Sequence, residues 1–406
     1  MRKKFPALIL FFCLSHVLFP AGQKERDFVK GNISEKIGIL RNLSDDERVL
    51  IAQKGMDFAI ENLSVLGHDE ELFELASASI TSLPADTVQV DGLGEEERRR
   101  ISEKLMAIFR MFDDRSVRSR ALEKISLYSG QNDELTVEFL NDYLSSAYRR
   151  NEEAGNVLEG AIVSLGRIGD RDSLSIIYNI WHSGIWPEYK DSADEALVAL
   201  SENSFPDIMR ILSLSDIIEF ERYFSLLRNS AEKNGDSFCE IAENALLIAI
   251  NNAESLRAGG PKERETFARF QKEAHDVLTA NRWSRAADVI KANVSLAKEA
   301  YERGDMSEED FSMMIRSSVL VPSHELAGIL TDMLSECNGK VEKIDRIVVG
   351  SAGGEMPAKS VVLALIFALG ELGDKTAFDT ILYVTYISYP LEVIDEAKKS
   401  LAKLRW

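Results

Sequence analysis

The chain has 406 residues, an apolar fraction of 45% and a formal net charge of −19. This apolar fraction excludes wholesale disorder, and the length allows about two or three compact domains or one continuous solenoid. A surface this acidic is repelled by phosphate backbones and by anionic headgroups, so we expect no nucleic-acid partner.

The first 22 residues have the pattern of a secretory signal peptide. Basic residues at 2–4 precede an apolar stretch at 5–19, and small residues follow it. The apolar stretch is shorter than the ~20 residues that a membrane span needs. We therefore predict an exported protein of the periplasm or cell envelope, with no integral span after signal removal. An uncleaved N-terminal anchor and a lipoprotein modified at Cys13 remain open as alternatives.

Beyond the signal, apolar residues recur at helical spacing almost throughout the chain. All seven prolines after residue 22 fall at boundaries that this periodicity defines independently. Residues 85–94 are polar and are predicted to form a loop, and residues 344–349 are the one weak candidate for a strand. Helices are predicted at 44–66 (behind a capping box from Ser44 to Glu47), 69–83, 95–112, after 114, after 133, 153–181 as a helix pair, 193–200, from 206, 215–231, 236–256, 261–280, 282–303, 323–337, 357–369, 376–388 and 391–404.

Two copies of one short pattern organise these helices. They read Leu165-Gly166-Arg167-Ile168-Gly169-Asp170 and Leu369-Gly370-Glu371-Leu372-Gly373-Asp374. In each copy the leucine ends the core of one helix and the first glycine permits close packing against the following helix. The second glycine takes the positive φ that ends a helix, and the aspartate caps the next one. The pattern predicts the turn between two antiparallel helices.

The two copies also match further along the chain, where Asp194-Glu195-Ala196 and Asp395-Glu396-Ala397 are predicted to open the next helices. The turns lie 204 residues apart, which fits about five repeats of ~40 residues. These residues resemble the HEAT-like repeats named from bilin lyases. The resemblance implies an α-solenoid scaffold that binds other macromolecules, and it carries over no catalytic residue.

The predicted fold class is therefore all-α, an α-solenoid or superhelix of antiparallel helix pairs. The predicted organisation is a signal peptide (1–22), N-terminal HEAT-like repeats (23–214), a segment of longer helices (215–303) and C-terminal HEAT-like repeats (304–406).

Motifs for catalysis are weak. Residues 353–360 resemble the sequence of a phosphate-binding loop, but Ala358 replaces its second glycine and no βαβ pattern surrounds it. We therefore interpret this stretch as a loop that leads into a helix. The histidines are dispersed and no Cys-x-x-Cys occurs, so we predict neither a metal nor a cofactor. Cys239 and Cys337 are interpreted as buried free thiols, with a disulfide between them left open.

Four residues are candidates for contact with a partner: Trp181, His182, Trp186 and Tyr189. They cluster on a predicted loop between repeats, where aromatic side chains often anchor partners. Helical spacing from Ile177 favours a core position for Trp181, and for Trp186 core and contact are equally expected. We predict a non-enzymatic exported scaffold or protein-binding solenoid at the cell envelope. The alternative is a ligand-binding protein or enzyme with a pocket on the concave face or in the 215–303 segment.

Overall fold

The computed structural model describes residues 22–67, 69–129, 133–153, 155–230, 235–346 and 356–404. These residues form 22 α-helices joined by turns and short 3-10 segments, with no strand among them, so the predicted all-α fold class is confirmed. None of the helices in these ranges is long and apolar enough to cross a membrane. The predicted signal peptide, up to residue 21, lies outside the described residues.

The chain divides into two compact units, residues 1–200 and 201–406. The boundaries predicted after residues 214 and 303 both fall inside the second unit. The helices of the first unit are α1 (Gln23–Lys30), α2 (Ile33–Leu40), α3 (Asp45–Leu66), α4 (Glu70–Ser82), α5 (Thr87–Asp91), α6 (Glu95–Met111), α7 (Arg115–Tyr128), α8 (Glu134–Arg150), α9 (Asn156–Ile168), α10 (Leu174–Ser183) and α11 (Lys190–Ser201).

The helices of the second unit are α12 (Phe205–Leu214), α13 (Ile217–Ser230), α14 (Gly235–Asn251), α15 (Ala253–Arg257), α16 (Pro261–Ala280), α17 (Ala287–Arg303), α18 (Glu308–Ser318), α19 (His324–Arg346), α20 (Lys359–Leu372), α21 (Phe378–Val384) and α22 (Leu391–Leu401). The longer helices predicted for 215–303 are present. Because α16 packs against α18 and α17 against α19, this segment continues into the last third of the chain without a break in packing.

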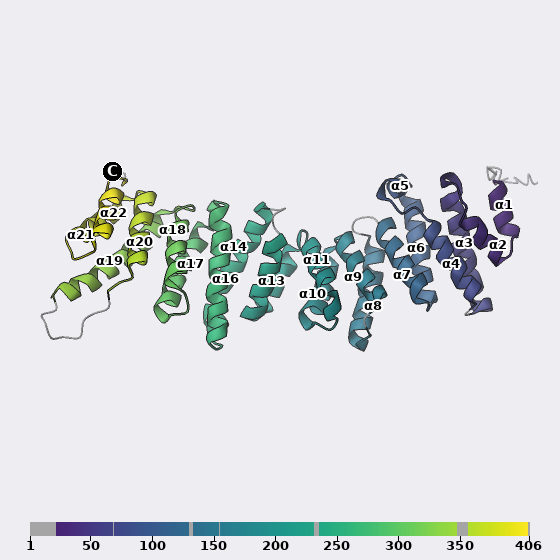
Figure 1. Cartoon of the computed structure of the whole chain (residues 1–406), viewed down its shortest axis with the longest axis horizontal. Coiled ribbons are helices and arrows are strands. Elements are labelled where there is room, and N and C mark those ends of the chain that lie inside the picture. Colours follow the sequence, from purple (N-terminus) through teal and green to yellow (C-terminus); the bar gives the residue numbers. More distant parts are fainter. Residues whose placement is uncertain are drawn as a thin grey trace, which may run out of the picture. The chain divides into compact units, whose positions relative to one another are not determined.

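Each unit has two layers of helices, as in an α-solenoid. In the first unit, α2, α4, α7 and α9 pack in succession in one layer, and α1, α3, α6, α8 and α10 form the other. In the second unit, α16, α18, α20 and α22 form one layer, and α14, α17, α19 and α21 form the other. Figure 1 shows how successive helices of each unit lie side by side. Each helix buries one apolar stripe against its neighbours, so the core of each unit runs between its layers.

The two matched turns have the predicted geometry. Gly169 (φ 73°) ends α9 and Gly373 (φ 66°) ends α20, both in the left-handed region that glycine adopts without strain. The Asp170 carboxylate accepts a hydrogen bond from the backbone N–H of Asp172 at 2.8 Å, and Asp374 accepts one from Thr376 at 2.9 Å. Helix termination therefore accounts for the second glycine of each pattern, and capping of the next helix accounts for its aspartate.

The first glycine of each pattern is required by a close approach of two helices. A Cβ added at Gly166 would lie 2.8 Å from Cα of Ala196, and one at Gly370 would lie 2.6 Å from Oγ of Ser400. The contacted helices are α11 and α22, the first helices of the next pairs. Both contacts join positions 30 residues apart, from 166 to 196 and from 370 to 400. The structural equivalent of Ala196 is therefore Ser400 and not Ala397. The prediction that residues 194–196 and 395–397 open the next helices is also wrong, because α11 begins at Lys190 and α22 at Leu391.

The predicted capping box at the start of α3 was also wrong. Ser44 precedes the helix, but its hydroxyl is hydrogen-bonded to the Glu47 carboxylate at 3.1 Å and does not cap a backbone N–H. A complete capping box instead opens α2, where Asn32 and Glu35 each accept the other's backbone N–H at 2.9 Å. Asparagine is as favourable at a helix cap as serine, so the same reciprocal bonding forms at the start of α2.

Two further expectations were wrong in detail. The predicted loop 85–94 contains α5, because Val90 is buried against the core and the Asp86 side chain caps the N–H of Gln89 at 2.7 Å. In the strand candidate 344–349, residues 344–346 belong to α19, and the remainder lies outside the described residues.

Candidate functional site

Three of the four predicted contact residues belong to the core of the first unit. Trp181, Trp186 and Tyr189 are only 5%, 4% and 6% exposed. The indole N–H of Trp181 donates to the Asp194 carboxylate at 2.6 Å, so its polar atom is satisfied internally. Only the ring of His182 is exposed, stacked on Tyr178 with 5.8 Å between centroids. The core position favoured for Trp181 is confirmed, and Trp186 takes the core position of its two alternatives. These rings form no exposed aromatic surface, because burying them is favourable once their polar atoms are paired.

The buried aromatic residues bond the backbone at two described positions between α8 and α9, Glu152 and Gly155. The indole N–H of Trp186 donates to the carbonyl oxygen of Glu152 at 2.8 Å. The phenol of Tyr189 is hydrogen-bonded to the backbone of Gly155, the residue that precedes α9. Trp186 and Tyr189 thus position a neighbouring part of the protein surface, but they do not form that surface themselves.

That surface borders a cavity of about 590 Å³ in the first unit, which we name the arginine pocket. Arg115 and Arg118 enter it from the first turn of α7, Tyr143 from α8, and Gly155 and Asn156 from the start of α9. Neither arginine forms an ion pair with another described residue. Ser116, Ser119 and Arg120 of α7 also line the cavity, and Arg120 donates to the Thr81 hydroxyl at 2.7 Å.

The Arg118 guanidinium packs against two aromatic rings that contact each other edge to face, Phe109 and Tyr143. Its central carbon lies 4.2 Å from the centroid of Phe109 and 5.3 Å from that of Tyr143, within the range of cation–π attraction. Its Nε is buried and has no hydrogen-bond partner in the described part of the chain. Burial raises the pKa of Tyr143, so this phenol stays neutral near pH 7.

A second cavity, of about 790 Å³, lies within the second unit, and we name it the α17–α19 groove. It exists because α18 and α20 pack closely, whereas α17 and α19 meet only over a short stretch. The exposed gap is lined at its base by buried apolar side chains of α18, α19 and α20, namely Phe311, Met333, Val361 and Leu365. Tyr301 stacks on Phe311 with 5.1 Å between ring centroids.

Charged residues line the rim of this groove. Lys298 forms ion pairs with Glu302 at 3.8 Å and with Glu336 at 2.5 Å. Lys340 and Lys343 are exposed and form no ion pair with any described residue. Cys337 also lines the groove, as a half-buried free cysteine whose pKa is raised by burial.

Residues 356–358, which belong to the segment that resembles a phosphate-binding loop, line the same groove. Ala358 is the cap residue of α20 and Lys359 its first residue, as the interpretation of a loop entering a helix requires. Lys359 is paired with Glu392, and the Ser360 hydroxyl contacts Glu308 and, at 3.2 Å, Ser312. Residues 353–355 of the motif lie outside the described residues.

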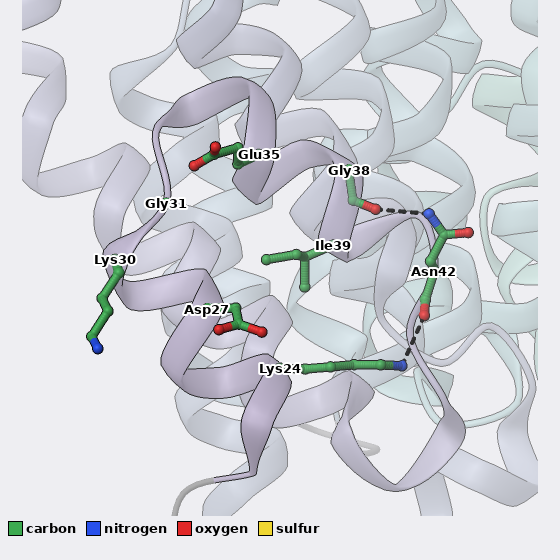
Figure 2. A pocket seen from close by; sticks show the side chains of 8 residues that line it. All are labelled: Lys24, Asp27, Lys30, Gly31, Glu35, Gly38, Ile39 and Asn42. Atoms are coloured by element: carbon green, nitrogen blue, oxygen red, sulfur yellow. Dashed lines mark hydrogen bonds between the residues drawn. The ribbon is translucent and has the colours of Figure 1, made fainter.

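A third hollow, of about 630 Å³, lies between α1 and α2 and is shown in Figure 2. Lys24 donates to the carbonyl oxygen of Asn42 at 3.0 Å, and the Asn42 amide donates to that of Gly38 at 2.9 Å. Because Glu35 is also engaged, in the α2 capping box, these polar groups mainly bond one another. This hollow offers a ligand fewer free groups than the other two cavities do.

The two stronger sites were missed by sequence reasoning, although a signal exists for both. Each places two cations three positions apart on one helix of an acidic chain, Arg115 with Arg118 and Lys340 with Lys343. Such spacing puts both side chains on one face. Neither a protein-family model nor a curated protein matches this sequence. The chemistry of these sites must therefore be argued from their residues.

Proposed function

We propose that the protein is an exported, non-enzymatic α-solenoid that binds a protein partner at the cell envelope. The export signal expected from residues 1–22 and the two-layered helical fold support this proposal. The observation that carries it is the α17–α19 groove, which combines an apolar base with two lysines at its rim that form no ion pair with a described residue.

The groove fits an amphipathic helix of the partner. Five groove residues follow α19 at helical spacing: Met333, Glu336, Cys337, Lys340 and Lys343. They extend over ten residues, or about 15 Å at the helical rise, which matches two to three turns of a bound helix. Apolar side chains of that helix would pack on the base of the groove, and its carboxylates would meet Lys340 and Lys343. The partner segment is thus amphipathic and acidic.

Cys337 provides a direct test, because Cys239 is fully buried. A photoreactive maleimide attached to Cys337 is expected to cross-link one envelope protein of defined mass. The double variant Lys340→Glu/Lys343→Glu should abolish the adduct, because it reverses the rim charge and leaves the base of the groove intact. The matched control is Cys337→Ala/Ser213→Cys, which moves the label to an exposed position on α12.

The control should give no adduct of that mass. If the label at Cys337 cross-links nothing, or the same proteins as the label at position 213, the groove is not the partner site. An adduct that survives the charge reversal would also contradict the proposed recognition of an acidic helix.

The alternative of a ligand site or active site in the 215–303 segment has less support. Its buried polar side chains Gln271 and His275 each have a partner in the core: the Gln271 amide donates to Asn293 at 3.0 Å, and His275 lies 3.1 Å from the hydroxyl of Ser317 in α18. None of these residues lines the three cavities described above. Their packing accounts for them as parts of the core of the second unit.

A further inference from the structure

We propose that the arginine pocket of the first unit binds a small organic ligand through a phosphate or carboxylate group. This site is separate from the partner groove of the second unit, and its existence does not depend on the proposed function.

The first argument is charge. The protein has 67 acidic and 48 basic residues, so most cations have nearby carboxylates. Arg115 and Arg118 nevertheless form no ion pair within the described residues, and they lie one turn apart on the face of α7 that lines the cavity. At this spacing their Cβ atoms are about 5–6 Å apart. Two guanidinium groups so placed present forked donors to the oxygens of one phosphate or carboxylate.

The second argument is that Arg118 is positioned before any ligand arrives. Its contacts with the rings of Phe109 and Tyr143 restrict the guanidinium, so less side-chain entropy is lost on binding. Its Nε is buried and faces no open space, so the terminal nitrogens of the guanidinium are the donors that an anion in the cavity can meet.

The third argument is the start of α9, which borders the same cavity. Gly155 supplies no capping side chain, so the N–H groups of the first turn keep their capacity to donate to an anion. Trp186 bonds Glu152 and Tyr189 bonds Gly155 through the hydrogen bonds described above. The buried aromatic residues therefore fix one wall of the pocket.

The remaining residues limit which ligands fit. Three glutamates also line the cavity: Glu152 is paired with Arg150 at 2.9 Å, and Glu123 and Glu153 are exposed. They disfavour a ligand that is anionic on every side. A volume of about 590 Å³ exceeds that of a bare ion and lies in the usual range for small-ligand pockets. The ligand thus has one oxyanion end and a hydroxyl-bearing or amino-bearing body.

The test is isothermal titration calorimetry of the purified full chain with two probes that have one oxyanion end and a hydroxyl-bearing body, glycerol phosphate and glycerate. At least one probe is expected to bind saturably, and the probe that does so identifies the oxyanion as phosphate or carboxylate. Arg115→Gln and Arg118→Gln should each weaken binding at least tenfold. Arg171→Gln, which removes one exposed arginine of the same unit outside the pocket, is the matched control and should bind like the unmodified protein.

A second variant separates binding from folding. Gly155→Asp adds a capping carboxylate at an extended residue whose Cβ position is open, so the melting temperature should stay the same or rise. The same carboxylate occupies the N–H groups of α9 and repels an anion, so binding should be lost. The proposal is overturned if neither probe binds with a Kd below about 10 mM. It is equally overturned if Gly155→Asp or both arginine variants bind as the unmodified protein does.

Discussion

Acid is expected to destabilise the second unit through one buried side chain, His275 of α16. The imidazole is fully buried, and its Nε2 lies 3.1 Å from the Ser317 hydroxyl, which donates to the carbonyl oxygen of Met314 at 3.2 Å. Burial lowers the pKa of His275 from 6.5 to about 4, although the neighbouring Asp276 opposes the shift. The folded protein therefore holds this histidine neutral.

The size and sign of the effect follow from that difference in pKa. Between pH 6.5 and about 4 the unfolded chain binds a proton that the folded chain does not, so stability falls as the pH falls through this window. The contribution is fully present above pH 6.5. At about 1.4 kcal/mol for each pKa unit, the loss on reaching pH 4 is about 3 kcal/mol. This is a substantial part of the stability of a typical domain.

The assay is urea unfolding followed by circular dichroism near neutral pH and at about pH 4.5. His275→Gln removes the titrating group and keeps an amide near Ser317, so the variant should lose less stability in acid than the unmodified protein. The exposed His182 gives the control, and His182→Gln should behave like the unmodified protein. The reasoning is refuted if His275→Gln shows the same loss between the two pH values.

Three further predictions concern the turns and the buried aromatic residues, each measured as a change in unfolding free energy. Gly370→Ala should cost about 1–3 kcal/mol because the added Cβ would overlap α22. The control Gly328→Ala, in α19 with open space at its Cβ, should stabilise by about 0.5–1 kcal/mol. Equal effects of the two substitutions would contradict the close approach of α20 and α22. Gly169→Ala, at φ 73°, should cost about 1–2 kcal/mol, and a neutral result would exclude backbone strain there. Trp186→Phe should cost about 1 kcal/mol because the Glu152 carbonyl loses its donor, and it should also weaken ligand binding in the arginine pocket.

The sequence by itself determined the fold class and the repeat turns. A helix end needs a residue that tolerates positive φ and an oxygen that caps the next helix, and the Gly-Asp pairs at 169–170 and 373–374 supply both locally. Apolar periodicity and proline positions located most helices because both depend on neighbouring residues in the chain. The missed α5 is a short helix whose buried Val90 depends on packing.

Only the tertiary structure decided which residues are available to a ligand or partner. Trp181 and Trp186 are of a residue type that is common at contact surfaces. Their burial depends on polar partners from other parts of the chain, namely Asp194 and the Glu152 carbonyl. The arginine pocket likewise joins the starts of α7 and α9, and the α17–α19 groove exists because adjacent helices pack unequally in the two layers. Spacing along one helix reveals which side chains share a face, whereas burial and unpaired charge depend on what the other helices bring to that face.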